Sequence, residues 1–266
     1  MQRGLFAEKA SPCYVDAVAI LVSNDDGITA AGLQALVAAL ETLDEVWVVA
    51  PDRNQSAVSH ALTLHRPLRI EPVGERRFSV DGTPTDCINL ALNAVLPERP
   101  RLVVSGINHG ANLGDDVTYS GTVSAAMEAT LLGVPAIAVS LVGTDEFDFT
   151  AAATFSRALA ERVMAQGLPP DTLLNVNVPP GSPKAIKGYL LTRQGKRRYS
   201  DVIVEKVDPR GKKYYWIGGG ELNYVAAEGT DFAAVHAGYI SITPLHLDLT
   251  NYASLQHLAN LLVAWP

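Results

Sequence analysis

Cysteine is scarce in this 266-residue chain, and no apolar run approaches the roughly 18 residues that a membrane-spanning helix needs. The two cysteines, Cys13 and Cys87, are too few for a disulfide framework and lack the spacing of a metal-binding motif. These absences favour a protein of the cytoplasm with no membrane partner. Residues 1–16 lack the apolar region and cleavage site of a signal peptide, so we expect a disordered extension or an upstream start codon there.

Positive charge is also in short supply. Lys and Arg number 21 against 28 Asp and Glu, and the formal net charge is -7 at pH 7. Such a chain has no general attraction for polyanions, which disfavours duplex nucleic acid as its main partner. An enzyme for small anions would therefore have to provide positive charge locally.

Short β-rich apolar runs alternate with amphipathic segments along most of the chain. This alternation predicts an α/β fold, in which a mostly parallel sheet carries helices on both faces. The expected strands cover residues 17–22, 46–49, 102–105, 136–141, 173–178 and 239–243, with a hairpin insertion at 68–70 and 77–80. The expected helices cover residues 30–42, 84–95, 122–132, 150–165 and 254–264.

The composition changes after Pro179, where Gly, Lys, Arg and Tyr become frequent. Alternating runs at residues 187–192 and 212–217 predict a projecting β-arm. We therefore divide the chain into an extension at residues 1–16, a core at 17–180, and a C-terminal part at 181–266 with the arm, a returning strand and a closing helix.

Two adjacent carboxylates, Asp25 and Asp26, follow the first expected strand. Within a strand they would point to opposite faces, but a turn can aim both at one point, and Gly27 permits a tight turn. Two carboxylates at a half-buried strand end repel each other, and a hard cation relieves that repulsion. The alternatives are that Asp26 caps the following helix, or that the segment is an ordinary surface turn.

Oxygen-bearing side chains follow two other expected strands, Ser56 after residues 46–49 and Asn108 after residues 102–105. Ligands of open α/β sheets bind beyond the carboxyl ends of the strands, so these oxygens can converge on the cation proposed for the two aspartates. An oxygen-only set suits Mg²⁺ or Mn²⁺ better than zinc. The nearby histidines lack the spacing of zinc ligands and are expected to be structural or to contact the substrate: His60, His65 and His109.

The connection after residues 102–105 ends at Ser120, Gly121 and Thr122, where a helix of small residues begins. A helix start offers free N–H groups and the positive end of the helix dipole, and it can bind an anion without a lysine. A cation and this terminus could hold one phosphate from two sides. The alternative is a plain helix cap at Ser120 or Thr122.

Four blocks, in family order, resemble the SurE family of survival-protein nucleotidases. They are ILVSNDDGITAAG at residues 20–32, VAPDRNQS at 49–56, DGTPTD at 81–86 and VSGINHGANLGDDVTYSG at 104–121. The segment at residues 229–244 extends the resemblance, whereas the long N-terminus departs from the family pattern.

The resemblance implies a Rossmann-like catalytic core and a metal-dependent phosphomonoesterase that releases phosphate from nucleoside 5'- and 3'-monophosphates, with short polyphosphate as a further substrate in some members. It implies one divalent cation per subunit, Mg²⁺ or Mn²⁺, and a homodimer or homotetramer built by an exchanged arm, for which residues 181–220 are the candidate. The implied metal ligands are Asp25, Asp26, Ser56 and Asn108. In this picture Asp25 or Asp26 orients the attacking water or accepts its proton. The transferring oxygens would be held by Asn112, Ser120, Gly121 and Thr122.

Other functions fit the residues less well. A covalent aspartyl phosphatase of the haloacid-dehalogenase kind needs two aspartates separated by one residue, whereas Asp25 and Asp26 are adjacent. No G-x-G-x-x-G follows the first expected strand, which disfavours a dehydrogenase. From a different class, the chain could be a nucleotide-binding stress-response factor with little turnover.

Overall fold

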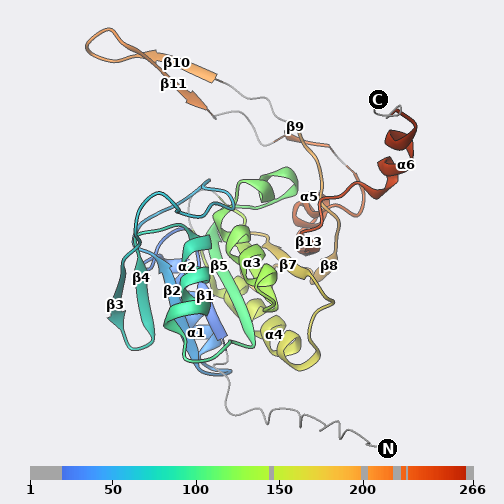
Figure 1. Ribbon diagram of the computed structural model, residues 1–266. Coiled ribbons are helices and arrows are strands. Elements are labelled where there is room, and N and C mark those ends of the chain that lie inside the picture. The colour runs from blue at the N-terminus through green and yellow to red at the C-terminus, as the bar shows by residue number, and fades with distance from the viewer. Residues whose placement is uncertain (1–19, 144–146, 199–202, 218–222, 226, 262–266) are drawn as a thin grey trace, which may run out of the picture.

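A computed structural model describes residues 20–143, 147–198, 203–217, 223–225 and 227–261 (Figure 1). The expected N-terminal extension and the first residues of the expected strand at 17–22 lie outside this range. The strands of the first part are β1 (Ile20–Ser23), β2 (Val46–Pro51), β3 (Ile70–Gly74), β4 (Arg77–Val80), β5 (Leu102–His109), β6 (Ala136–Leu141) and β7 (Thr172–Val178). The helices there are α1 (Ala31–Leu40), α2 (Pro84–Leu90), α3 (Gly121–Leu131) and α4 (Thr150–Gln166).

The C-terminal part adds six short strands and two helices among the described residues. These are β8 (Tyr189–Leu191), β9 (Arg197–Arg198), β10 (Ile203–Val207), β11 (Lys213–Ile217), β12 (Asn223–Tyr224), α5 (Asp231–His236), β13 (Ile240–His246) and α6 (Tyr252–Leu261). None of the helices within the described part of the chain is long and apolar enough to cross a membrane.

Nine strands form the main sheet, in the order β3-β4-β2-β1-β5-β6-β7-β13-β8. The central strands β4, β2, β1, β5, β6 and β7 are parallel neighbours, and β13 joins β7 antiparallel. The chain leaves β1 toward β2 on one side and later returns to place β5 on the other side. The order of the sheet therefore reverses between β1 and β5, which is where open α/β sheets form their ligand crevice.

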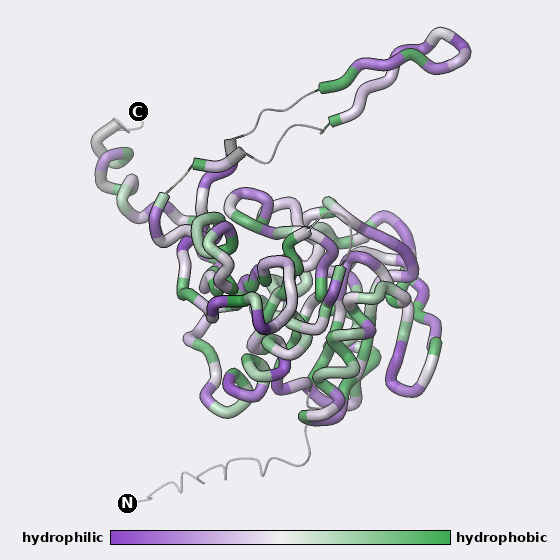
Figure 2. The backbone as a smooth tube through the Cα atoms, turned by 180° about the vertical axis from the view of Figure 1, so that it is seen from behind, coloured by the Kyte–Doolittle hydropathy of each residue, from purple (hydrophilic) through white to green (hydrophobic). Residues whose placement is uncertain are grey.

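The alternation of side chains along the central strands separates two hydrophobic layers. Leu102 and Val104 of β5 belong to the layer under α1 and α4, whereas Val103 belongs to the layer under α2 and α3. Helix α1 buries one stripe of its surface in the first layer, at Leu33, Leu36, Val37 and Leu40. Figure 2 shows the hydrophobic segments gathered inside the body and the hydrophilic ones in the outer loops. The predicted α/β class, with helices on both faces of a mostly parallel sheet, is confirmed.

Helix α2 begins where the sequence predicts, with Pro84 at its first position. Thr83 and Asp86 form a capping box, in which each side chain accepts a hydrogen bond from the other residue's backbone N–H. The expected helix at residues 84–95 is present, with an α-helical part at Pro84–Leu90 and a π-helical segment at Ala91–Val95.

The β-arm prediction is confirmed for one run and wrong for the other. Residues 213–217 form β11, which pairs antiparallel with β10 in a hairpin that projects away from the body (Figure 1). The run at residues 187–192 instead supplies β8, which extends the main sheet parallel to β13. Alternation identifies a strand, but the partner of that strand depends on packing that a local pattern does not encode.

Candidate functional site

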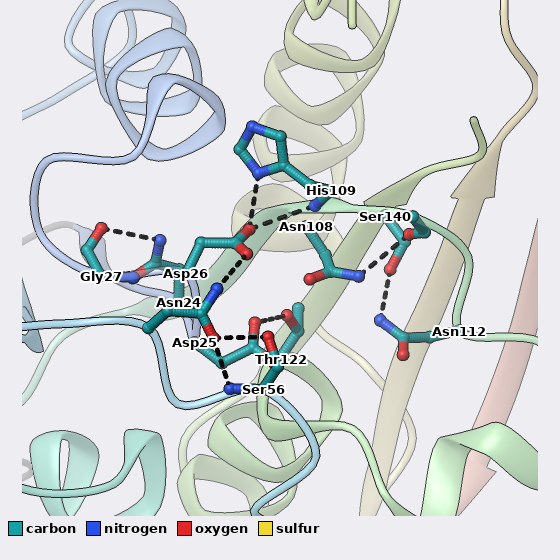
Figure 3. Close-up of polar contacts among 12 residues, drawn as sticks. Asn24, Asp25, Asp26, Gly27, Ser56, Asn108, His109, Asn112, Thr122 and Ser140 are labelled. Atoms are coloured by element: carbon teal, nitrogen blue, oxygen red, sulfur yellow. Dashed lines mark hydrogen bonds and ion pairs between the residues drawn. The ribbon is translucent and has the colours of Figure 1, made fainter. Parts of the chain in front are cut away.

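The two aspartates lie in a tight turn directly after β1. Asn24 builds this turn, because its Nδ2 donates to Gly27 O at 3.0 Å and its Oδ1 accepts from Gly27 N at 3.2 Å. Gly27 has a φ of +103°, a conformation that residues with a side chain rarely adopt. Figure 3 shows Asp25 and Asp26 turned toward the same group of polar side chains, as the sequence reasoning expected of a turn.

Asp25 is buried, with 4% of its surface exposed, and packs against the start of α3. Its Oδ1 accepts a short hydrogen bond from Thr122 Oγ1. Burial raises the pKa of Asp25 to about 6, the Thr122 hydroxyl opposes this rise, and the charge of Asp26 adds to it. In the metal-free protein, the negative charge of Asp25 is therefore destabilised at neutral pH, and a bound cation would relieve this.

Asp26 is held by the end of β5. Its Oδ2 accepts from the backbone N of His109 at 3.1 Å and lies 2.8 Å from Nδ1 of the same residue. Its Oδ1 lies 3.5 Å from Nδ2 of Asn54, on the side of the loop that carries Ser56. The alternative in which Asp26 caps α1 does not occur, because Ala30 is the N-cap residue of that helix.

Asn108 is the penultimate residue of β5. Its Nδ2 donates to Gly110 O at 2.9 Å, and its side-chain carbonyl is turned toward the two aspartates (Figure 3). Between Ser105 and Asn108 the pairing with β6 contains one extra residue of β5, because the partners advance only from Ala138 to Ser140. A bulge of this kind changes the direction of the side chains that follow it.

Ser56 lies in the loop after β2, which is anchored beside the aspartates. Gln55 N donates to Asp25 O at 2.7 Å. The Oγ of Ser56 donates to Asn54 Oδ1 at 2.6 Å, which leaves the lone pairs of that hydroxyl for another partner.

Helix α3 brings its N-terminus to the same place. Ser120 is its N-cap and accepts from Val123 N at 3.1 Å, so the cap interpretation holds for the Ser120 hydroxyl. Thr122 directs its hydroxyl at Asp25, and its backbone N–H also lowers the pKa of that carboxyl. The backbone N–H of Gly121 lies in the first turn of α3, where no carbonyl of the helix can accept its hydrogen bond.

Asn112 is buried in a polar network at the carboxyl ends of β6 and β7. Its Nδ2 donates to Ser140 Oγ at 2.8 Å, and its backbone N donates to Asn177 Oδ1 at 2.8 Å. The amides of Asn175 and Asn177 donate to Asn112 O at 2.9 and 3.0 Å. Sequence reasoning missed Asn175, Asn177 and Ser140, although a polar residue within an apolar strand is a usable signal.

Sequence reasoning also missed the partner of His60. Nε2 of His60 lies 2.9 Å from Oε2 of the buried Glu128 on α3, and Asn89 on α2 donates to the other oxygen at 2.9 Å. Ser59 adds a hydrogen bond of 2.7 Å from its Oγ to Thr118 O. The loop that carries Ser56 is therefore fastened to the helix whose N-terminus meets Asp25.

The base of the C-terminal part contacts the segment before α3. Lys196 pairs with Asp115 at 2.9 Å and Arg197 pairs with Asp116 at 2.5 Å, so these two basic residues connect the C-terminal part to the segment before α3. Asp231 is buried and accepts from the backbone N–H groups of Gly114 and Gly195, which gives it a structural role.

The donor set fits a hard divalent cation. All four expected ligands offer oxygen, and the two shorter hydrogen bonds of Asp26 fall on Oδ2, whereas Oδ1 has only the 3.5 Å contact with Asn54 Nδ2. No group of three or more His, Cys, Asp or Glu side chains that could hold a metal occurs in the described part of the chain. The four expected ligands, Asp25, Asp26, Ser56 and Asn108, are all oxygen donors, which is the chemistry that Mg²⁺ and Mn²⁺ prefer in proteins.

The chain is similar to known proteins over most of its length. A family model described as "Survival protein SurE" matches residues 20–201. The chain is 60% identical to the 5'-nucleotidase SurE of Geotalea daltonii over 237 residues, which are 89% of this chain and 96% of that protein. It is 58% identical to the 5'-nucleotidase SurE of Pelobacter propionicus over 238 residues, with the same two coverages. The crystal structure of the SurE protein from Aquifex aeolicus matches with a TM-score of 0.83 and 47% identity, over 91% of this chain and 99% of that one.

Proposed function

This chain belongs to the SurE family, and we propose that it is a metal-dependent phosphomonoesterase that hydrolyses nucleoside 5'-monophosphates to nucleoside and phosphate. One observation carries the proposal on structural grounds. Asp25 and Asp26 follow β1, Asn108 lies one residue before the end of β5, and the two strand ends meet at the switch point of the sheet, beside the N-terminus of α3. This places anionic oxygen donors next to a helix terminus suited to a phosphate.

Asp25, Asp26, Ser56 and Asn108 would hold one Mg²⁺ or Mn²⁺ ion per subunit. When bound, the ion would supply positive charge that polarises a phosphoryl oxygen and positions or activates water. The net charge of -7 gives the protein no general attraction for a phosphate, so this local charge accounts for the binding of an anionic substrate.

The chain's own residues perform the other steps. A carboxylate oxygen of Asp25 or Asp26 orients the attacking water or accepts its proton. The N–H of Gly121 at the helix terminus binds a phosphoryl oxygen, and Asn112, fixed by its buried network, donates to another. Ser120 and Thr122 complete the phosphate site, with their hydroxyls also holding the helix start and Asp25 in place.

We extend the proposal to nucleoside 3'-monophosphates and short polyphosphate as further substrates. The test is phosphate release from a panel of nucleoside monophosphates and tripolyphosphate, with Mg²⁺, with Mn²⁺ or with a chelator, for the wild type and Asp25→Asn. Metal-dependent release that the mutation abolishes is the expected result. Tight nucleotide binding with no hydrolysis under any metal would instead favour a nucleotide-binding stress-response factor.

We also propose that residues 181–266 join subunits into a homodimer or homotetramer in the cytoplasm. The hairpin β10–β11 exposes large apolar side chains, at Ile203, Val207, Tyr214, Tyr215, Trp216 and Ile217. A lone two-stranded hairpin is marginally stable in water, and a partner subunit would cover this surface. Light scattering on the wild type and on a variant that lacks residues 203–217 tests this, and a monomeric wild type would contradict it.

A further inference from the structure

His109 is the last residue of β5 and belongs neither to the expected metal ligands nor to the expected phosphate contacts. It follows Asn108 directly, after the bulge that separates Ser105 from Asn108 in the pairing with β6. Adjacent residues of one strand point in opposite directions, so Asn108 and His109 approach the aspartates differently. Asn108 turns a carbonyl toward them, whereas His109 brings two N–H donors to Asp26 (Figure 3).

The two contacts of His109 fall on a single oxygen of Asp26. Its backbone N lies 3.1 Å from Oδ2 and its Nδ1 lies 2.8 Å from the same atom. An ionised carboxylate only accepts hydrogen bonds, so Nδ1 is the ring nitrogen that carries the hydrogen. Oδ1 of Asp26 is left on the side of Asn54, whose side chain also binds the expected ligand Ser56.

Two phenyl rings fix the orientation of the imidazole. The ring of His109 packs edge-to-face on Phe147, with centroids 5.0 Å apart, and on Phe149, with centroids 4.9 Å apart. Phe147 and Phe149 are stacked on each other, and Phe149 is buried at the start of α4. The side chain of His109 is therefore held by packing from a segment that lies outside the oxygen cluster.

We propose that His109 is a positioning residue for the metal site. Its Nδ1–H fixes Oδ2 of Asp26, so that Oδ1 is presented to a divalent cation in one orientation. This inference rests on the metal dependence proposed above and deepens it. Groups that orient a ligand in this way raise metal affinity, because the ligand loses less freedom when the metal binds.

Three substitutions separate the hydrogen bond from the packing. His109→Asn places an amide N–H near the position of Nδ1, His109→Gln carries the same amide one methylene farther out, and His109→Ala removes the donor. The measurements are the Kd for Mn²⁺ by calorimetry, kcat and KM with a nucleoside monophosphate, and the Tm in chelator.

We expect His109→Ala and His109→Gln to raise the Kd for Mn²⁺ by about 10- to 100-fold, as removal of a ligand's orienting partner typically does. His109→Asn should stay within roughly threefold of the wild type, less than the tenfold or more that a hydrogen bond to a charged group is worth. We expect the kcat of His109→Ala and His109→Gln to be closer to the wild-type value at saturating Mn²⁺ than at low Mn²⁺. The Tm of these variants in chelator should change little.

Two results would overturn the proposal. One is wild-type Mn²⁺ affinity in His109→Ala, or in His109→Gln where the alanine variant does not fold. The other is an equal loss in His109→Asn and His109→Gln, which would assign the effect to packing. If the wild type hydrolyses nucleotides only with metal and the variants give one of these results, the proposed function stands and only the role of His109 is lost. A wild type with no affinity for metal would contradict both the proposed metal dependence and the role of His109.

Discussion

A Cβ atom on Gly121 would lie 2.7 Å from Cβ of Asp25 and 2.9 Å from its Oδ2. The first turn of α3 therefore approaches the first aspartate as closely as a backbone without a side chain allows. The third atom near this position is Cγ of Pro84, at 3.1 Å, so the added methyl group would also crowd the start of α2. The N-terminal end of α3 and the carboxylate of Asp25 are in this way held close to each other.

Gly121→Ala should lower kcat/KM at least about tenfold, because displacement of a positioned group by less than an ångström has effects of this size or more. Gly74→Ala in β3 is the matched control, since its added Cβ meets only ordinary contacts with Arg77, the nearest at 3.6 Å. Steady-state kinetics on both variants check this. Equal activity of the two would show that the helix start can move without loss.

Asn108→Ala removes an expected ligand and should weaken Mn²⁺ binding by about tenfold or more, as loss of an oriented oxygen ligand does. Asn251→Ala, at an exposed asparagine before α6, is the control. Calorimetric titration with Mn²⁺ and assays at several metal concentrations provide the readout. Full metal affinity and turnover in Asn108→Ala would contradict the convergence of oxygens from three strand ends.

Asp25 should make the stability of the metal-free protein depend on pH. Its pKa is about 6 in the folded protein against an ordinary value of 3.8, so the folded state binds the proton more tightly. The stabilisation of the folded state by this bound proton is fully present below the ordinary pKa of 3.8 and is lost as the pH rises through about 6. A shift of about two units corresponds to about 3 kcal/mol.

Denaturant unfolding in chelator, for the wild type and Asp25→Asn at pH 5 and pH 8, isolates this contribution. The wild type should lose about 1–1.5 kcal/mol more than the variant between the two values, because at pH 5 the folded wild type already carries most of the proton and the variant has no charge to bury. Parallel pH profiles would show that Asp25 ionises without penalty. The same substitution should abolish turnover, which would make Asp25 a residue kept for function at the expense of stability.

Glu128→Gln should loosen the loop that carries Ser56. The hydrogen bond from His60 holds the pKa of Glu128 below its ordinary value, and the Asn89 amide acts in the same direction. We expect a loss of about 1–3 kcal/mol in the free energy of unfolding at neutral pH, as for a buried charged hydrogen bond. Glu161→Gln, in an exposed i,i+4 pair with Arg157, should change it by less than about 0.5 kcal/mol.

The pH dependence gives Glu128 a second check. A lowered pKa means that its contribution is present above the ordinary value of 4.5 and is lost as the pH falls through the lower folded value. The difference between the wild type and Glu128→Gln should therefore shrink below about pH 4.5. A difference that does not change with pH would attribute the effect to packing alone.

Local patterns in the sequence determined the fold class and the place of the site. The period of apolar residues identified the central strands and the helices, because which side chains face the core follows from spacing along the chain. The adjacency of Asp25 and Asp26 after a buried strand, and the oxygen donors after other strands, indicated a cation at the carboxyl end of the sheet. The assignment of each donor to the metal or the phosphate came from the family resemblance and stays a prediction.

Only the tertiary structure decided how these segments meet. His109 and Asp26 are 83 residues apart, and their contact depends on β5 lying beside β1 and on the extra residue in β5. The partner of His60, the buried asparagines of β7 and the place of β8 beside β13 are of the same kind. The physical reason is that strand order and register are set by packing between distant segments, whereas a sequence pattern reports only which face of its own element is buried.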